Sequence, residues 1–119
     1  MRRGLAVALP WIAAAFVLNG CTKPVPIKCE VTAPTACPTP VPHYNDVAAI
    51  VEQRCATPCH SGIIDGPWPL TDYEHVADWA DIVRAEVLAC TMPPADSGVA
   101  ITDEERLAIL TWIRCGFPE

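Results

Sequence analysis

The sequence has little positive charge, no alternating strand pattern and, after its first 20 residues, no long apolar run. Eight Lys and Arg stand against fourteen Asp and Glu, which gives a formal net charge of −6 over 119 residues. A nucleic-acid-binding protein needs a basic face, so this balance argues against that class. A membrane-spanning helix needs about 20 consecutive apolar residues, so we predict no such helix in the mature chain.

Residue patterns of enzymes are missing as well. The sequence offers no Ser/His/Asp arrangement, no phosphate-binding loop and no pair of inward carboxylates. Methionine is scarce, with two in the chain, whereas there are seven Cys and thirteen Pro. One domain is expected at this length, and any chemistry of that domain therefore rests on its cysteines and their neighbours.

The first 20 residues have the features of an export signal. Two arginines precede an apolar stretch over residues 4–18, and Asn19-Gly20-Cys21 follows. The closing Leu18-Asn19-Gly20-Cys21 resembles the lipobox of bacterial lipoproteins, which implies that Cys21 is lipidated and becomes the first mature residue. The alternative is an ordinary cleaved signal with Cys21 as a thiol.

Export has consequences for charge and for redox state. Loss of residues 1–20 removes two arginines and no acid, which changes the formal net charge from −6 to −8. The mature chain would lie outside the cytoplasmic membrane, where disulfides persist. The lipobox resemblance implies an anchor on the periplasmic or outer-surface face of a bacterial membrane. Thr22 favours the outer membrane, because retention in the inner membrane of enteric bacteria uses Asp at that position.

Residues 21–42 form a proline-rich segment. Six of residues 22–42 are proline, and proline fixes φ and lacks the N–H that helices and central strands need. We predict an extended spacer with a reach of up to about 65 Å, at about 3.1 Å per residue. Cys29 and Cys37 lie within it, and we expect a local disulfide between them.

Residues 43–119 are predicted to form one small all-α domain of three to four helices. A domain of this size has a marginal core and usually needs a cofactor, a metal or disulfides. Apolar residues recur at helical spacing in three stretches, which are 45–55, 71–90 and 102–117. The middle stretch would form one long helix or two short helices broken near Ala80. Segments 60–70 and 89–101 are rich in Gly and Pro and are expected to be loops.

Cap residues mark the ends of these helices. In chain order they are Asn45 or Asp46, the pairs Thr71–Glu74 and Thr102–Glu105, and Gly116. The buried stripe of the last helix is expected to carry Leu107, Leu110 and Ile113, with Trp112 beside it.

The pattern with the clearest chemistry is Cys55-Ala-Thr-Pro-Cys59-His60, directly after the first helix. It is similar to the haem-attachment motif of c-type cytochromes, Cys-x-x-Cys-His. In that motif each thiol adds across one haem vinyl group, and the imidazole reaches the iron from the same turn. Three residues separate the cysteines here instead of two, although side chains at i and i+4 share one face of a helical turn.

Two other interpretations of this hexapeptide stay open. A zinc site would use both cysteines and the histidine, with His75 or Cys90 as the fourth ligand, but ligands adjacent in sequence fit a tetrahedral site poorly. A plain Cys55–Cys59 disulfide is the simplest alternative, and it gives His60 no role.

Met92 is the one thioether that remains after loss of the signal. It lies in the loop Thr91-Met92-Pro93-Pro94 rather than on an apolar helix stripe, so it is a candidate ligand. A His/Met axial pair raises the reduction potential of a haem iron. If Met92 does not ligate, His75 is the fallback sixth ligand, or the iron keeps an open position as in a sensor or an enzyme.

In their order along the chain, these pieces resemble a small class I cytochrome c domain of a bacterial lipoprotein over residues 44–119. The matching pieces are the first helix, the Cys…Cys-His turn, Gly66-Pro67, Met92-Pro93-Pro94 and the last helix with Trp112. The resemblance implies a helical fold in which the first and last helices cross beside one covalent haem c. It implies His60 and Met92 as axial ligands, and a hydrogen bond from His60 to the carbonyl of Pro67 that fixes the tautomer.

The resemblance also leaves Cys90 and Cys115 to pair with each other, beside Cys29 and Cys37, although four cysteines allow three connectivities. The function that it implies is a membrane-anchored single-electron carrier, not an enzyme. Its partners would be redox proteins with basic docking patches. The alternative function is a haem-free, disulfide-stapled lipoprotein that binds an envelope component.

Overall fold

The computed structural model describes residues 28–63 and 67–119. The predicted signal, Cys21, the start of the spacer and Gly66 lie outside these residues. The described chain is all-α, as predicted, and contains no strand. Its helices are α1 (Tyr44–Val51), the π-helix η1 (Glu52–Ala56), α2 (Tyr73–Asp78), α3 (Ala80–Leu88) and α4 (Asp103–Arg114). None of these described helices is both long and apolar enough to cross a bilayer.

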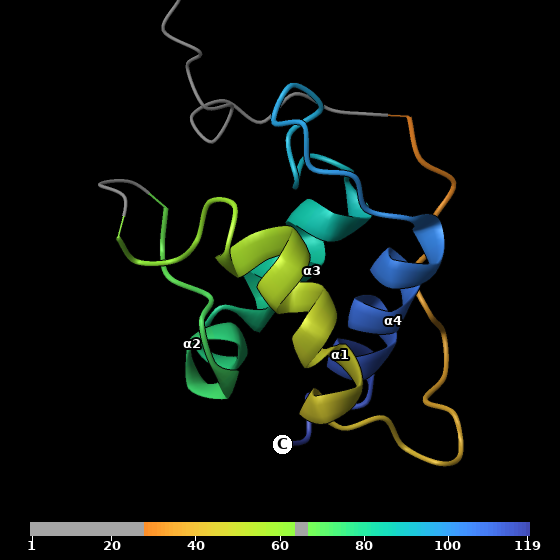
Figure 1. Ribbon diagram of the computed structural model, residues 1–119. Coiled ribbons are helices and arrows are strands. Elements are labelled where there is room, and N and C mark those ends of the chain that lie inside the picture. Colours follow the sequence, from red (N-terminus) through yellow and green to blue (C-terminus); the bar gives the residue numbers. More distant parts are fainter. Residues whose placement is uncertain (1–27, 64–66) are drawn as a thin grey trace, which may run out of the picture.

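Helix α4 packs against both α1 and α3 and lies on the right-hand side of the domain in Figure 1. The core on its inner side is built around Trp112, which is 0% exposed. The rings of Tyr44, Tyr73 and Phe117 surround Trp112 with centroids 5.6–6.5 Å away. Aromatic side chains bury large apolar areas, so this cluster holds α1, α2 and α4 together. The other large side chains that are fully buried are Arg106, Ile109, Leu110, Val47, Val51 and Val76.

The helix starts agree with the sequence prediction in one case out of three. The N-cap of α1 is His43 rather than Asn45 or Asp46. Asp46 lies within the first turn of the helix, where its carboxylate accepts the backbone N–H of His43 (2.8 Å). At α2 the cap is Asp72, whose carboxylate accepts the His75 N–H (3.0 Å), so the predicted pair of Thr71 and Glu74 is wrong. Aspartate caps a helix at least as well as threonine, and it is one residue closer to the helix.

The ends of α4 were predicted correctly. The Glu105 N–H donates to the Thr102 hydroxyl (3.1 Å), and the Thr102 N–H donates to the Glu105 carboxylate (2.9 Å). Gly116 follows the helix with φ +87°, a left-handed conformation that glycine adopts without strain. The stretch 71–90 forms two helices with the break at Trp79.

The buried stripe of α4 differs from the prediction. Leu107 is 44% exposed, whereas Arg106 is 0% exposed. Leu110, Ile113 and Trp112 are buried as predicted, so the prediction is wrong for Leu107 alone. Arg106 takes the inward position instead, because it shares the i, i+3, i+4 and i+7 spacing with Ile109, Leu110 and Ile113. A charged side chain therefore occupies a core position.

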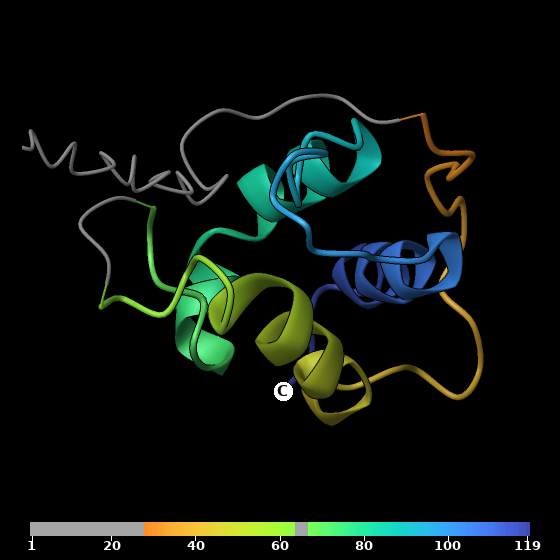
Figure 2. The same cartoon turned by 45° about the horizontal axis from the view of Figure 1, so that its top comes forward.

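The described part of the proline-rich segment, residues 28–42, runs alongside α4 from its first turn to its last (Figures 1 and 2). The Glu30 N–H donates to the Asp103 carboxylate (3.3 Å), and the Arg114 guanidinium donates to the carbonyl of Thr35 (3.2 Å). The segment has neither helix nor strand, as expected for its proline content. It is, however, held against the domain over this length.

Two disulfides attach this segment. Cys29 bonds to Cys90 and Cys37 bonds to Cys115, with Cα atoms 6.2 Å and 5.1 Å apart. The participation of these four cysteines in disulfides is confirmed, but both expected pairings are wrong. An extended path along α4 carries the two cysteines of the segment away from each other, and each then meets a cysteine of the helical domain.

Candidate functional site

A cavity of about 260 Å³ lies between η1, α3 and the loop that follows α3. Its lining includes all four residues that the sequence singled out for chemistry, which are Cys55, Cys59, His60 and Met92. The other lining side chains are mostly apolar: Trp68, Leu70, Trp79, Ile82, Val83, Val87, Pro93, Pro94 and Ile101, with Arg54 and Glu86 among them. Apolar walls with a few convergent polar groups are typical of a cofactor or small-molecule site.

The backbone turn that carries the cysteines is wider than an α-helical turn. The His60 N–H donates to the carbonyl of Cys55 (2.9 Å), and the Thr57 N–H donates to the carbonyl of Glu52 (2.9 Å). Both bonds span five residues, as in a π-helix, where an α-helix would span four. His60 therefore follows Cys55 by one hydrogen-bonded turn, despite the additional residue in the sequence pattern.

The imidazole of His60 is oriented by a backbone carbonyl. Its Nδ1 lies 2.6 Å from the carbonyl oxygen of Trp68. A carbonyl only accepts, so Nδ1 carries a proton, and in the neutral ring the lone pair stays on Nε2. Such a bond to the outer nitrogen is the usual support of a metal-ligating histidine.

The expected acceptor of this bond was Pro67, which does not line the cavity. The Leu70 N–H donates to the carbonyl of His60 (2.9 Å), so the returning chain is paired with the histidine from that point. This pairing sets Trp68, one residue later than predicted, opposite the ring.

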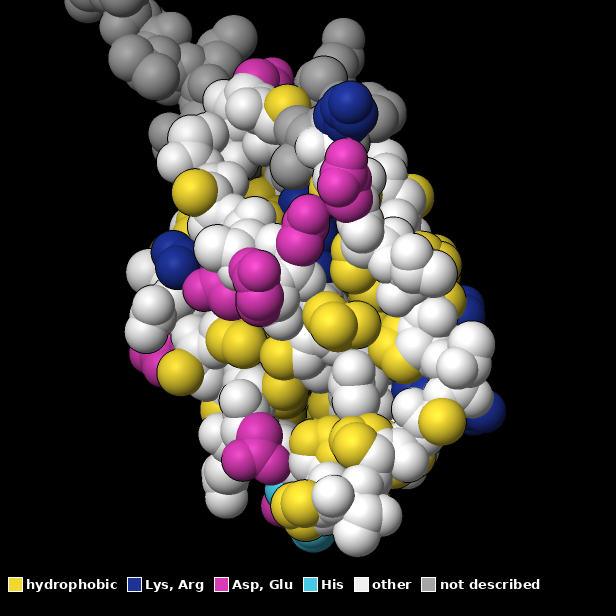
Figure 3. Space-filling view, turned by 90° about the vertical axis from the view of Figure 1, so that its right-hand side faces the viewer, with side chains coloured by type: hydrophobic (Ala, Val, Ile, Leu, Met, Phe, Trp, Pro, Cys, Tyr) yellow, Lys and Arg dark blue, Asp and Glu magenta, His cyan; other side chains and the backbone are white. Residues whose placement is uncertain are grey.

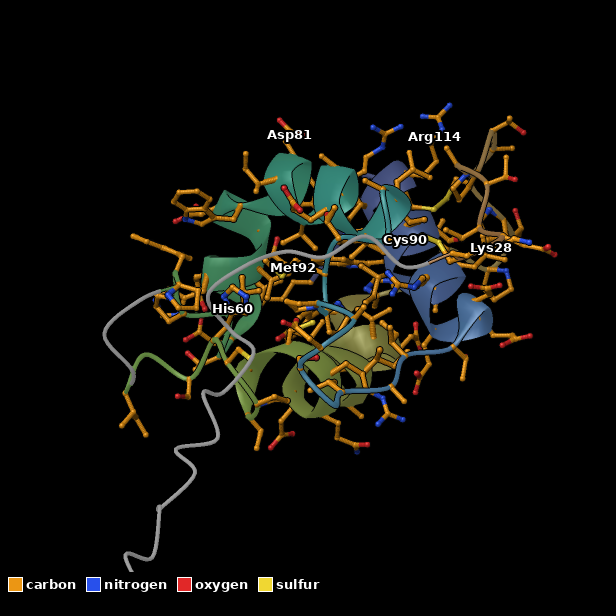
Figure 4. All side chains as sticks on the ribbon, turned by 90° about the horizontal axis from the view of Figure 1, so that it is seen from above. Lys28, His60, Asp81, Cys90, Met92 and Arg114 are labelled. Carbon is orange, nitrogen blue, oxygen red and sulfur yellow. A yellow bond between two sulfur atoms is a disulfide. The ribbon has the colours of Figure 1, made fainter. Side chains whose placement is uncertain are left out.

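Met92 approaches the cavity from the loop after α3. Figure 4 shows Met92 and His60 next to each other in the view from above, with Cys90 on the side toward the N-terminal segment. The Met92 N–H donates to the carbonyl of Glu86 (3.4 Å). The Thr91 hydroxyl bonds to the Glu86 carboxylate and carbonyl, so the start of this loop is tied back to the last turns of α3.

The two cavity cysteines are in different states. Cys55 is a half-buried free thiol, so the disulfide with Cys59 that was considered above does not form. Burial raises the pKa of the Cys55 thiol to about 11, and the nearby charge of Arg106 lowers it in part. Cys59 is disulfide-bonded.

Neither of the two fourth ligands predicted for a zinc site is available at the cavity. Cys90 is bonded to Cys29, and His75 does not line the cavity. The Nδ1 atom of His75 instead lies 2.8 Å from the Asp72 carboxylate at the start of α2. Within the described ranges no group of three or more His, Cys, Asp or Glu side chains is arranged to hold a metal ion.

No role near the cavity was predicted for three charged side chains, Arg54, Glu105 and Arg106. Arg54 forms a salt bridge with Glu105 (2.9 Å) and so joins η1 to the first turn of α4. Hydrogen bonds from Arg54, and then from the Thr102 backbone, lower the pKa of Glu105. Arg106 contacts the loop of Met92 (2.8 Å). Its place on the stripe of Ile109 and Ile113 was the available signal for it.

No protein-family model matches the chain, and the searches of curated proteins and of solved structures also returned no match. A functional conclusion for this chain therefore depends on the residues of the cavity.

Proposed function

We propose that the chain is a lipid-anchored monohaem c-type cytochrome that carries single electrons and catalyses no substrate conversion. The observation that supports this proposal best is the cavity itself. Two segments that are separate in the sequence, residues 55–60 and the loop after α3, bring two cysteines, one histidine and one methionine to a single apolar space. A cytochrome c domain needs these four residues at one site. A helical domain without a cofactor has no need to bring them together.

The side chains present fit a covalent haem c. Cys55 and Cys59 would bond to the two vinyl groups, and His60 and Met92 would be the axial ligands. When bound, the haem supplies reversible one-electron chemistry at its iron. The chain contributes the Trp68 carbonyl, which keeps the Nε2 lone pair of His60 available, and apolar walls that exclude water.

The additional residue between the cysteines is compatible with this proposal. In Cys-x-x-Cys-His the first cysteine and the histidine are four residues apart, which matches an α-helical hydrogen bond. Here they are five residues apart, and the hydrogen bond from His60 to Cys55 spans five. Attachment needs both sulfurs as thiols, so Cys59 must be reduced when the haem adds.

Anchoring and docking are the remaining parts of the proposal. The lipid would be on Cys21, outside the described residues, and the outer membrane is the favoured location. The formal net charge of −8 that remains after loss of residues 1–20 suits redox partners with basic docking patches. Figure 3 shows acidic side chains gathered on one face of the domain, and the first turn of α4 carries Asp103, Glu104 and Glu105. Electron transfer to a basic partner should slow as salt is added.

The test is haem loading of the full chain, exported in a bacterial host that has cytochrome c maturation proteins. We expect a denaturing gel to show covalent haem, and the reduced spectrum to show a sharp α-band. Cys55→Ser should weaken covalent attachment, and His60→Ala should abolish a normal spectrum. The matched control is His75→Ala, since His75 does not line the cavity.

Met92→Ala separates an electron carrier from a protein with an open iron position. The variant should keep covalent haem but lose the far-red band of Met-ligated ferric haem and bind carbon monoxide when reduced. Rapid carbon monoxide binding by the unaltered protein would instead favour a sensor or an enzyme. A colourless, correctly exported protein would overturn the cytochrome proposal and favour the disulfide-stapled lipoprotein, which the two observed disulfides also suit.

A further inference from the structure

Arg106 is a buried charge without an ion pair in the described part of the chain. Its side chain is 0% exposed, and the salt bridges found there involve other residues. Burial of a charge without a partner is unfavourable, and burial accordingly lowers the pKa of this guanidinium. An apolar side chain would fill the same position at a lower cost in free energy. The contacts of Arg106 must therefore account for its presence.

Those contacts are two backbone carbonyls on the cavity side. The Nη1 atom donates to the carbonyl of Met92 (2.8 Å) and to the carbonyl of Val87 in the last turn of α3 (3.2 Å). Both of these residues line the cavity. One nitrogen of α4 thus joins the end of α3 to the residue that would supply the sixth ligand.

The backbone N–H and the backbone carbonyl of Met92 are hydrogen-bonded to two different helices, α3 and α4. Its N–H donates to Glu86 of α3 (3.4 Å), and its carbonyl accepts from Arg106 of α4 (2.8 Å). Hydrogen bonds from a charged donor are stronger than those between neutral groups. The contact with Arg106 is therefore the stronger of these two restraints on the Met92 backbone.

The guanidinium of Arg106 has hydrogen-bond donors for which the described residues supply no acceptor. Its Nε and Nη2 atoms are buried and have no hydrogen-bond partner among the described residues. Among the described residues, Asp103, one turn earlier on α4, raises the pKa of the guanidinium through its negative charge but forms no salt bridge with it. The guanidinium is also close enough to Cys55 to lower the pKa of that thiol. A positive charge at such a place disfavours further positive charge in the cavity.

We propose that Arg106 is a positioning residue for the sixth ligand and raises the reduction potential of the site. This inference rests on the proposed function. Arg106 holds the Met92 backbone so that the thioether stays on the iron. Its charge, which no carboxylate pairs, disfavours the ferric state relative to the ferrous state, because the ferric state has one more positive charge.

Arg106→Met tests this inference, because methionine fills the buried space without the charge or the donors. The matched control is Arg84→Met, since Arg84 is exposed on α3. The full chains are exported and loaded with haem as above. For the Arg106 variant we expect a weakened far-red Met–iron band and a lower reduction potential. Cyanide should bind about tenfold faster or more, because the charged hydrogen bond to the Met92 carbonyl is lost.

Arg106→Lys supplies the rescue, since an ammonium keeps the charge and donates to carbonyls. It should restore most of the potential and part of the Met–iron band. Amide hydrogen exchange at residues 91–99 should be faster in Arg106→Met than in Arg84→Met, which measures the loop without reference to the iron.

The outcomes separate this inference from the proposed function. A wild-type chain that takes up no haem overturns both. If the wild type is loaded but Arg106→Met matches Arg84→Met in band, cyanide rate and potential, the inference on Arg106 is overturned alone. A merely structural role would change stability in Arg106→Met and leave the potential where it was, which also contradicts the inference.

Discussion

Trp112 and Trp68 show how differently the two sides of the domain are held. Trp112 is 0% exposed and is surrounded by rings of α1, α2 and the C-terminal turn. Trp68 is 46% exposed and contacts mainly Trp79, with ring centroids 4.9 Å apart. The first side chain stabilises the helical frame, and the second forms a part of the cavity wall that the described residues leave about half exposed.

The cavity side packs against the Trp112 core through Leu70, Val83 and Ile101, and covalent and polar links add to this contact. The Cys29–Cys90 disulfide, the Arg54–Glu105 salt bridge and the bond from Arg106 to Met92 each make such a link. Ile82 of the cavity wall is 53% exposed. Part of the apolar cavity wall is therefore exposed to solvent, whereas the Trp112 cluster is buried.

The largest effect is expected for Trp112→Ala. Truncation of a fully buried tryptophan costs about 3–5 kcal/mol, a large part of the stability of a small domain. Denaturant unfolding of the haem-free chain measures it. Trp68→Ala is the comparison, and we expect it to leave that stability nearly unchanged while it weakens haem loading. Equal losses in the two variants would contradict the division into frame and cavity side.

The second-largest effect is expected for loss of a disulfide, and the two disulfides should differ in their effect on the cavity side. Replacement of either pair by serines, Cys29 with Cys90 or Cys37 with Cys115, is expected to cost about 2–4 kcal/mol, since each closes a long loop. Loss of the first pair should also weaken the Met–iron band, because Cys90 lies two residues before Met92. Loss of the second pair should leave that band intact. Absorption spectra of the loaded variants distinguish the two results.

The helical stretches and the start of α4 were predictable because the signals are local. Thr102 and Glu105 satisfy each other's backbone groups within one turn, and the apolar spacing of residues 102–117 needs no knowledge of the rest. The disulfide partners, the Trp68 carbonyl and Arg106 depend on how distant segments return in space. Cys29 meets Cys90 only because residues 28–42 run along α4, which proline content alone does not determine.

A smaller effect is expected for Thr102→Ala. Loss of a capping hydroxyl costs about 1 kcal/mol, and thermal unfolding of the haem-free chain would show it. Thr111→Ala in the same helix is the control. Its hydroxyl bonds to the Leu107 carbonyl one turn back (2.7 Å), and alanine has the higher helix propensity, so no loss is expected. A similar loss in both variants would mean that the cap is not the cause.

The smallest effect concerns pH. The pKa of Glu105 is lowered from its ordinary value of 4.5 in the folded chain, so its charge stabilises the fold above that value. This contribution is lost as the pH falls through the lower folded pKa. Glu105→Gln should therefore lower the unfolding midpoint by a few degrees at pH 7, and the difference should shrink below pH 4.5.

Arg54→Gln removes the partner that contributes most to this shift. Its midpoint should show the same narrowing in acid as Glu105→Gln, and the double variant should lose less than the two single losses added together. Fully additive losses would show that the interaction between Arg54 and Glu105 contributes no free energy to the stability of the fold.

The disulfide pairing has a consequence for the order in which the protein matures. On the proposed export route the chain emerges N-terminus first, so Cys29 and Cys37 reach the oxidising compartment long before Cys90 and Cys115. Oxidation in order of emergence would join the first two to each other. The observed pairs then require those thiols to stay reduced, or a disulfide isomerase to exchange the bonds within seconds to hours. The segment of residues 28–42 is therefore exported before the helical domain, but its disulfides form only after Cys90 and Cys115 have been exported.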